Sequence, residues 1–353
     1  MTAHLLANGR LMNAPDGGMA NELAQAPAAV LAQARELAPP LSALMTRLAR
    51  RSPDVVVTCA RGSSAHAATF AKHLIERYLG IPVAAAAPNI ASVYHRRLKL
   101  RHQLFLAISQ SGSSDDLIET AAAARAADAV TAAIVNDTES PLAQACEFVL
   151  PMAAGPELSV AATKTFIASL AASLRLIAYW TGDKDMSAAC ERLPTRLARA
   201  AELDWSAALS PLASATALIA IGRGPTLAVA REAALKLKET CALHAEAFSG
   251  AEFRHGPIAL VANALPILML APSDASAMGF VDLAADLHAA GARVLMTGVG
   301  DASAALPALS PDQADADAIC LIQSFYAFLL RLAQARGADV DRPPHLQKVT
   351  RTR

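Results

Sequence analysis

The chain has 353 residues, which is long for one hydrophobic core and suits two domains of ordinary size. Hydrophobic residues make up 54% and charged residues 18%, and 31 Lys and Arg balance 31 Asp and Glu to a net charge of zero. This balance excludes the basic excess that is typical of general nucleic-acid binders, although a small anion needs only a local cluster of donors.

The five cysteines are scattered, odd in number and never spaced as CxxC, so neither a disulfide framework nor a zinc site is predicted. The chain opens without the charged and apolar regions of a signal peptide. Apolar runs such as 264–271 are too short to cross a bilayer. We therefore expect a soluble, cytoplasmic protein without membrane contact. The cysteines are Cys59, Cys146, Cys190, Cys241 and Cys320.

From the N-terminus, residues 1–25 show no clear period and predict a mobile lead-in, whereas leucines near helical spacing predict a helix at 26–50. Short apolar runs then alternate with long Ala- and Leu-rich stretches, as in a parallel sheet covered by helices on both faces. The predicted fold class is therefore α/β. Strands are predicted at 55–59, 82–86, 104–109, 130–136 and 148–151, and helices at 64–78, 114–126 and 160–181.

The second half repeats this plan at an offset of 162 residues. The shift carries Arg61-Gly62 onto Arg223-Gly224, 104–108 onto 266–270 and 130–134 onto 292–296. Chance similarity between two α/β domains is the alternative, but three registers at one offset favour two tandem copies of one unit. We therefore predict a lead-in and helix at 1–50, a first domain at 51–182, a second domain at 183–338 and a C-terminal tail at 339–353.

Two turns of the first copy follow predicted strands, where an open parallel sheet offers free backbone N–H groups to ligands. Arg61-Gly62-Ser63-Ser64 follows the first strand, and the turn 109–114 follows the third. Gly112 permits a tight turn, and hydroxyls together with helix N-terminal amides can surround phosphate oxygens. Neither turn is a Walker A or GxGxxG motif, so nucleoside triphosphates and dinucleotides rank lower.

Helix capping is the alternative use of these serines. The repeat helps to separate the two readings, because the equivalent turn of the second copy contains Pro272 and Asp274. A residue without an N–H and an acidic side chain suit phosphate poorly, so the fold itself does not demand the serines. We expect phosphate to bind to the first copy.

The second copy carries a cluster of ionisable residues. Lys236 and Glu239 lie three residues apart in a predicted helix and share a face, which by itself favours a solvated ion pair. The acids and histidines between 244 and 255 lack the spacing of an HExxH-type site, so neither a metal nor another cofactor is predicted. His255 precedes Gly-Pro at a break in the helical pattern, which indicates a side chain presented by a loop.

Five segments together resemble the sugar isomerase (SIS) family, and most of all the isomerase half of glutamine-dependent glucosamine-6-phosphate synthase. They run in the family's order from about residue 55 onward, which makes the set far more specific than any single turn. The fold implied is two tandem SIS domains, each a parallel sheet flanked by helices on both faces. The segments are CARGSS at 59–64, ISQSGSSDD at 108–116, AGPELSVAATKTF at 154–166, ALKLKETCALHAEAFSGAEFRHGP at 234–257 and DVDRPPHLQKV at 339–349.

The resemblance implies which groups bind a phosphosugar and which move protons. Glu239 would shuttle a proton between C1 and C2 of the sugar, helped by Lys236. His255 would open the sugar ring from the neighbouring subunit of a homodimer with shared active sites, and Lys348 would lie in a C-terminal tail that closes over the site. A carboxylate, a histidine and a carbonyl-directed lysine suit aldose–ketose chemistry. The sugar phosphate would contact Ser63, Ser64, Ser109, Gln110, Ser111 and Ser114, with Val160 lining the site.

The chain departs from the synthase in three places. It begins Met1-Thr2-Ala3-His4 and its first cysteine is Cys59, so we expect neither the N-terminal glutaminase domain nor ammonia release from glutamine. Ala161-Ala162 replaces part of an Ala-Ser pair, which removes a hydroxyl near the sugar. The tail after Lys348 is more basic than that of the synthase, which leaves tail closure and sugar preference open.

An isomerase half without a glutaminase is expected to exchange free ammonia. The favoured hypothesis is therefore a glucosamine-6-phosphate deaminase that yields fructose 6-phosphate and ammonia. Two alternatives keep the fold, namely an isomerase or deglycase for a related phosphosugar and an ammonia-dependent synthase. A third is a non-catalytic sugar-phosphate sensor. The retention of Glu239, His255 and Lys348 argues against a sensor. The direction of flux and any effector stay open.

Overall fold

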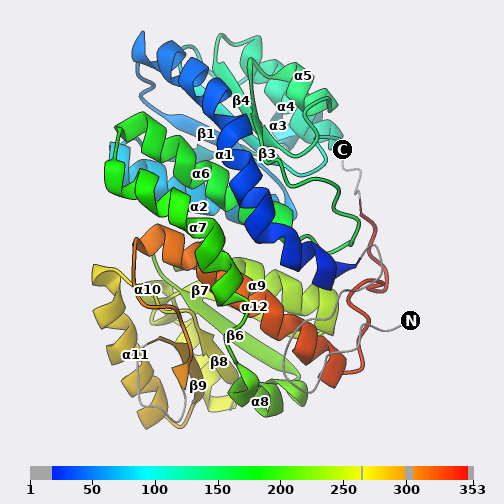
Figure 1. Cartoon of the computed structure of the whole chain (residues 1–353), viewed down its shortest axis with the longest axis vertical. Helices are drawn as coiled ribbons and strands as arrows, with labels where there is room; N and C mark the ends of the chain where they lie inside the picture. The colour runs from blue at the N-terminus through cyan, green and yellow to red at the C-terminus, as the bar shows by residue number, and fades with distance from the viewer. Residues whose placement is uncertain (1–17, 264, 299–304, 349–353) are drawn as a thin grey trace. The chain divides into compact units, whose positions relative to one another are not determined.

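The computed structural model describes residues 18–263, 265–298 and 305–348 (Figure 1). Two parallel five-stranded sheets, each flanked by helices, organise two compact units. This confirms the prediction of an α/β fold with two tandem parallel sheets. The first unit contains Ala28–Glu157, Lys164–Glu191 and 347–348, and the second contains 18–27, Leu158–Thr163 and Arg192–Leu346.

The first sheet has the strand order β2-β1-β3-β4-β5, and all neighbouring strands are parallel. Its central strands are buried along their whole length, which explains why they appear in the sequence as unbroken apolar runs. All five strands lie within one residue of their predicted ends. They are β1 (Val56–Cys59), β2 (Val83–Ala85), β3 (Leu104–Ser109), β4 (Val130–Val135) and β5 (Phe148–Pro151).

Helices cover both faces of the first sheet. The face with Val57, Phe105 and Ala133 packs against two helices that follow β3 and β4. Two longer helices contact each other and the sheet strands. The first pair is α4 (Asp115–Arg125) and α5 (Pro141–Ala145), the second pair is α2 (Gly62–Leu79) and α6 (Lys164–Thr181), and α3 (Asn89–Ser92) contacts α4.

Two predicted helix starts are wrong. α6 begins at Lys164 rather than at 160, where the Glu157 carboxylate accepts the N–H of Thr165, the second residue of the helix, at 3.1 Å. α1 (Met19–Ala49) begins within the predicted lead-in, because Asp341 Oδ1 accepts the Met19 N–H at 2.7 Å and caps the helix. The rest of the predicted lead-in, 1–17, lies outside the described residues.

The second sheet has the order β7-β6-β8-β9-β10, which is the order of the first sheet strand for strand. Four of its strands overlap their counterparts in the first sheet at the offset of 162 residues, so the predicted repeat is confirmed. The strands are β6 (Ala217–Gly222), β7 (His244–Ser249), β8 (Pro266–Met269), β9 (Arg293–Thr297) and β10 (Ala305–Leu306).

The second sheet is covered in the same way. Phe253 and Phe280 pack with Ile219 and Met269 on one face, and two long helices contact each other in the rest of the unit. The first face is covered by α10 (Gly250–Phe253) and α11 (Met278–Ala289), and the long helices are α9 (Thr226–Cys241) and α12 (Ala314–Ala335). The remaining elements are α7 (Lys184–Ala200), α8 (Leu209–Ala213), η1 (Ser206–Ala208), η2 (Pro257–Asn263) and η3 (Ala275–Ala277).

Among the described helices, α12 alone is long and apolar enough to span a membrane by composition. Its apolar window is 94% buried inside the protein. Phe325 and Tyr326, in the middle of the helix, are fully buried. The apolar residues of α12 therefore form part of the core of the second unit.

Candidate active site

The turn after β3 gathers hydroxyl and backbone N–H groups at the carboxyl edge of the first sheet. Ser109, the last residue of β3, accepts the Gly112 N–H at 3.1 Å through its Oγ. Ser111 Oγ accepts the Ser113 N–H at 3.3 Å, and the Ser113 hydroxyl donates to the Ser111 carbonyl at 3.1 Å. These local bonds hold the turn in one shape.

The same turn is attached to β4 at one end and leads into α4 at the other. The Gln110 carbonyl accepts the Asn136 N–H at 3.3 Å, which ties the turn to the end of β4. Ser114 is the N-cap residue of α4, and within the described chain its hydroxyl makes no capping hydrogen bond. Hydroxyls and the first N–H groups of α4 thus lie together, the arrangement that binds anions at helix N-termini.

A second serine-bearing turn lies beside the first one. Ser63 and Ser64 are in the first turn of α2, which follows β1, the direct neighbour of β3 in the sheet. Arg61, the N-cap residue of α2, donates from Nε and Nη2 to Asp116 Oδ2 at 3.0 and 2.6 Å. Asp116 is in the first turn of α4 and its side chain is 1% exposed. The Arg61 guanidinium therefore joins the two turns and neutralises a carboxylate that would repel an anion.

Lys348 lies beside a buried glutamate of the first unit. Its Nζ is 3.5 Å from Glu157 Oε2, and the two side chains are 25% and 0% exposed. Glu157 also accepts the Thr165 N–H at 3.1 Å and the Thr165 hydroxyl at 2.5 Å. Glu157 thus holds the lysine of the C-terminal tail against the start of α6. Glu157 is not among the site residues predicted from the sequence, although it lies in the AGPEL segment that carries part of the resemblance.

In the second unit, α9 carries Glu232, Lys236 and Glu239 at spacings of four and three residues, so they share one helix face. Lys236 Nζ lies 2.5 Å from Glu239 Oε2 and 3.4 Å from Glu232 Oε1. The Lys236 and Glu232 side chains are 1% and 0% exposed, whereas that of Glu239 is 21% exposed. Spacing alone favoured a solvated pair, but the structure buries the lysine and leaves one carboxylate reachable. Glu232 was missed, although its position four residues before Lys236 was a signal.

Burial of Lys236 opposes its positive charge, whereas the carboxylates of Glu232 and Glu239 favour it. The two carboxylates outweigh burial, and the pKa of Lys236 is raised above its usual value. Lys236 is thus an ammonium at neutral pH. A carboxylate beside such an ammonium can take a proton from a carbon acid and return it, while the ammonium stabilises negative charge that develops on a neighbouring oxygen.

The other two predicted residues of the second unit lie outside this cluster. His255 is exposed in the turn after α10 and lines a surface hollow of about 480 Å³ with Arg223 and Arg254. Val160 is half-buried in the segment Leu158–Thr163. Each unit therefore holds its own group of predicted site residues. The first unit holds Ser63, Ser64, Ser109, Gln110, Ser111, Ser114 and Lys348, and the second holds Val160, Lys236, Glu239 and His255.

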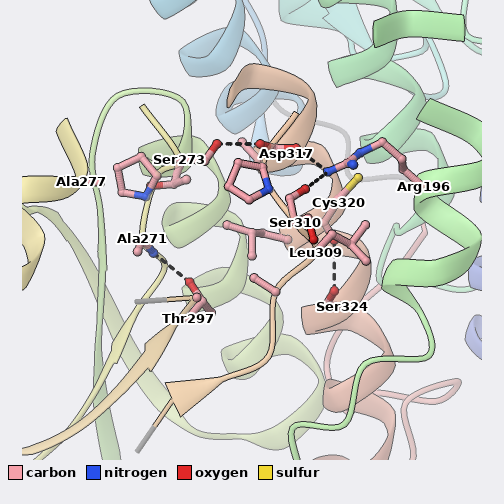
Figure 2. A pocket seen from close by; sticks show the side chains of 17 residues that line it. Arg196, Ala271, Ser273, Ala277, Thr297, Leu309, Ser310, Asp317, Cys320 and Ser324 are labelled. Carbon is pink, nitrogen blue, oxygen red and sulfur yellow. Dashed lines mark hydrogen bonds and ion pairs between the residues drawn. The ribbon is translucent and has the colours of Figure 1, made fainter. Parts of the chain in front are cut away.

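The second unit's counterpart of the serine turn lies beside a hydrogen-bonded ion pair of the protein's own side chains (Figure 2). At the offset of 162 residues, 109–111 correspond to 271–273, which line a cavity of about 370 Å³. The Ser273 hydroxyl donates to Asp317 Oδ2 at 2.6 Å, and Arg196 Nη2 donates to Asp317 Oδ1 at 2.6 Å. An internal carboxylate thus takes the hydrogen bonds that a bound anion would take.

Within the described residues, no three His, Cys, Asp or Glu side chains are grouped as metal ligands would be.

The family model of the SIS domain matches residues 51–178 and 211–305. The glutamine–fructose-6-phosphate aminotransferase (isomerizing) of Symbiobacterium thermophilum is 34% identical over 333 residues, which cover 87% of this chain and 52% of the relative. The chain thus spans about half the length of the curated relatives it matches.

Solved structures give the same picture of the fold. A protein of Silicibacter pomeroyi DSS-3, provisionally assigned as a phosphosugar isomerase, is 40% identical with a TM-score of 0.88, over 92% of this chain and 99% of that one. A glucosamine-6-phosphate deaminase of Thermotoga maritima has a TM-score of 0.69 at 23% identity, over 93% of this chain and all of that one. The second likeness is one of fold alone.

Proposed function

Because this chain belongs to the SIS domain family, we propose that it is a phosphosugar-isomerising enzyme of amino-sugar phosphate metabolism, and specifically that it deaminates glucosamine 6-phosphate. The observation that carries the proposal is the buried Lys236 ammonium at 2.5 Å from the partly exposed Glu239 carboxylate. Burying a charge is costly, and ion pairs with shifted pKa values cluster at functional sites.

The proposed reaction begins with the open-chain form of glucosamine 6-phosphate, which has an aldehyde at C1 and an amine at C2. Glu239 removes the proton on C2, and the Lys236 ammonium stabilises the negative charge that moves toward the C1 oxygen. The C1 oxygen takes up a proton from water, and the protonated Glu239 returns its proton to C1, which leaves a protonated imine at C2. Water adds to this imine, and fructose 6-phosphate and ammonia are released.

The remaining residues have supporting roles in the proposal. The serine turns after β1 and β3 hold the phosphate group, because they combine hydroxyls with helix N-terminal N–H groups. Lys348, held by Glu157, acts on the C1 or C2 oxygen from the C-terminal tail. His255 opens the sugar ring from the neighbouring subunit of a homodimer, which its exposure permits. Five free and buried thiols support a reducing cytoplasmic location.

The test measures the release of ammonia and fructose 6-phosphate from glucosamine 6-phosphate, and compares the wild-type protein with the variant Glu239→Gln. We expect kcat to fall by about 10³-fold, because the variant keeps the shape of the side chain and loses its basicity. Glu246→Gln is the matched control, since Glu246 is an exposed glutamate on β7, and it should keep its activity. Equal activity of both variants, or no ammonia from the wild-type protein, contradicts the proposal.

A second candidate is an aldose–ketose isomerase or deglycase for a related phosphosugar. The 40% identical protein of Silicibacter pomeroyi, provisionally assigned as a phosphosugar isomerase, favours it. A panel of ketose, aldose and amino-sugar phosphates separates the candidates, since this candidate requires a substrate that is turned over faster than glucosamine 6-phosphate. Incubation of fructose 6-phosphate with ammonium tests the synthase direction. Tight phosphosugar binding without any turnover would instead support a sensor.

A further inference from the structure

A tyrosine of the core is hydrogen-bonded to the ionisable cluster on α9. Helices α9 and α12 lie against each other in the second unit (Figure 1). Tyr326, in the middle of α12, is fully buried and its hydroxyl donates to Glu232 Oε1 at 3.1 Å. The side chains therefore form a line, Tyr326–Glu232–Lys236–Glu239, that begins in the core and ends at the partly exposed Glu239 carboxylate.

The distances along this line are unequal. The Lys236 ammonium lies 2.5 Å from Glu239 but 3.4 Å from Glu232. Glu232 is a carboxylate without exposure to solvent, so it depends on protein donors for its hydrogen bonds. The Tyr326 hydroxyl supplies one such bond and thereby reduces the pull of Glu232 on the ammonium. The Lys236 ammonium therefore lies closer to Glu239 than to Glu232.

We infer that Tyr326 is a positioning residue for the proton-transferring carboxylate: by donating to Glu232, it keeps the Lys236 ammonium close to Glu239. Tyr326 acts on the reaction through Glu232 and Lys236. The effect on kcat rests on the proposed function, whereas the effect on the surroundings of the lysine does not.

Tyr326→Phe removes the hydroxyl and keeps the ring. In the variant, Glu232 loses a donor and draws the ammonium away from Glu239, so we expect kcat to fall about tenfold. KM for glucosamine 6-phosphate should change less than about twofold, because the serine turns proposed to bind phosphate belong to the other unit.

Ser324→Ala is the matched control on the same helix. Ser324 is 1% exposed, and its hydroxyl donates to the carbonyls of Ala200 and Cys320 at 2.8 and 3.2 Å. The control thus loses a buried hydroxyl that does not touch Glu232, and its kcat should stay within about twofold of the wild-type value. An unchanged kcat in Tyr326→Phe, or an equal fall in Ser324→Ala, overturns the inference.

A second measurement does not need turnover. In protein labelled with ¹⁵N-lysine, the Nζ resonance of Lys236 is assigned from its loss in Lys236→Met. We expect this resonance to shift in Tyr326→Phe and to stay in place in Ser324→Ala. A resonance that is the same in Tyr326→Phe as in wild type overturns the inference. Absence of turnover in the wild-type protein would instead overturn the proposed function, and the two failures are thus distinguishable.

Discussion

Gly112 is the residue on which the shape of the serine turn depends. Its φ of +60° lies in the left-handed region. A Cβ built at this position would lie 2.0 Å from Ser140 Oγ and 2.5 Å from Ser140 Cβ. Ser140 cannot simply turn aside, because its Oγ accepts the Ala143 N–H at the start of α5. Both the backbone conformation and the space around it therefore require glycine.

At this residue scale, we expect Gly112→Ala to lower the free energy of unfolding by about 3 kcal/mol, from left-handed strain and overpacking together. Gly80→Ala is the control, since Gly80 has a φ of +67° and no atom within 4 Å of a built Cβ. Gly80→Ala should lower the free energy of unfolding by the backbone strain alone, about 1 kcal/mol. Urea unfolding of both variants measures the difference, and equal losses would show that Ser140 yields without cost.

At the scale of elements, Asp317 joins three parts of the second unit. It lies in the first turn of α12, and its carboxylate accepts hydrogen bonds from Arg196 of α7 and from Ser273, which follows β8 (Figure 2). The side chains of Asp317 and Arg196 are 11% and 13% exposed. Without Asp317, Arg196 loses its close partner and keeps only the Asp312 carboxylate at 3.9 Å, and a largely buried charge that loses its close partner is costly.

Asp317→Ala should therefore lower the free energy of unfolding by about 3 kcal/mol. The control is Asp204→Ala. It removes the partner of Arg331 of α12 in a pair whose side chains are 64% and 37% exposed, together with two exposed hydrogen bonds from Ser206. The exposed pair should contribute less than about 1 kcal/mol. Chemical denaturation at moderate salt measures both values. A loss for Asp317→Ala as small as that for Asp204→Ala would contradict the role of Asp317 in joining these elements.

The elements that the sequence predicts well are those whose burial is uniform. β1, β3 and β4 are buried throughout and stand out as apolar runs. β7 was missed because it lies at the edge of its sheet and exposes His244 and Glu246. The repeat could have found it, since 83–85 plus 162 gives 245–247.

The site was predicted less completely than the fold, because buried ionisable residues resemble surface ones in a sequence. Glu232 and Glu157 are acidic residues in amphipathic surroundings, and only tertiary packing shows that their carboxylates are fully buried. Tyr326 lies in an apolar helix where any aromatic residue would suit the core. The position of its hydroxyl next to Glu232 depends on how α12 packs against α9, which no local pattern encodes.

At the scale of the whole molecule, the five cysteines are free and buried in both units. Burial raises the pKa of Cys59, Cys146 and Cys320 to about 12 and that of Cys190 to about 11. In the unfolded chain these thiols lose their protons near pH 8.5. The folded state therefore keeps protons that the unfolded state has released. The contribution of these thiols to the free energy of unfolding is therefore fully present below about pH 8.5. It is lost as the pH rises toward 12.

We therefore expect the free energy of unfolding to fall between pH 9 and 11 by about 1 kcal/mol per pH unit for each such thiol. Cys59→Ala should reduce this slope by the contribution of one thiol, whatever its effect on stability at neutral pH. Urea unfolding at several pH values gives the two slopes. Parallel slopes for the variant and the wild type would contradict the role of Cys59.

The central claim is that Glu239 moves a proton between C2 and C1 of glucosamine 6-phosphate and so causes release of ammonia. The most direct test is NMR of [1,2-¹³C]glucosamine 6-phosphate incubated with the protein in D₂O. The account predicts that fructose 6-phosphate and ammonia appear in equal amounts, and that both are lost in Glu239→Gln while Glu246→Gln retains them. A substrate spectrum that stays unchanged with the wild-type protein would contradict the account.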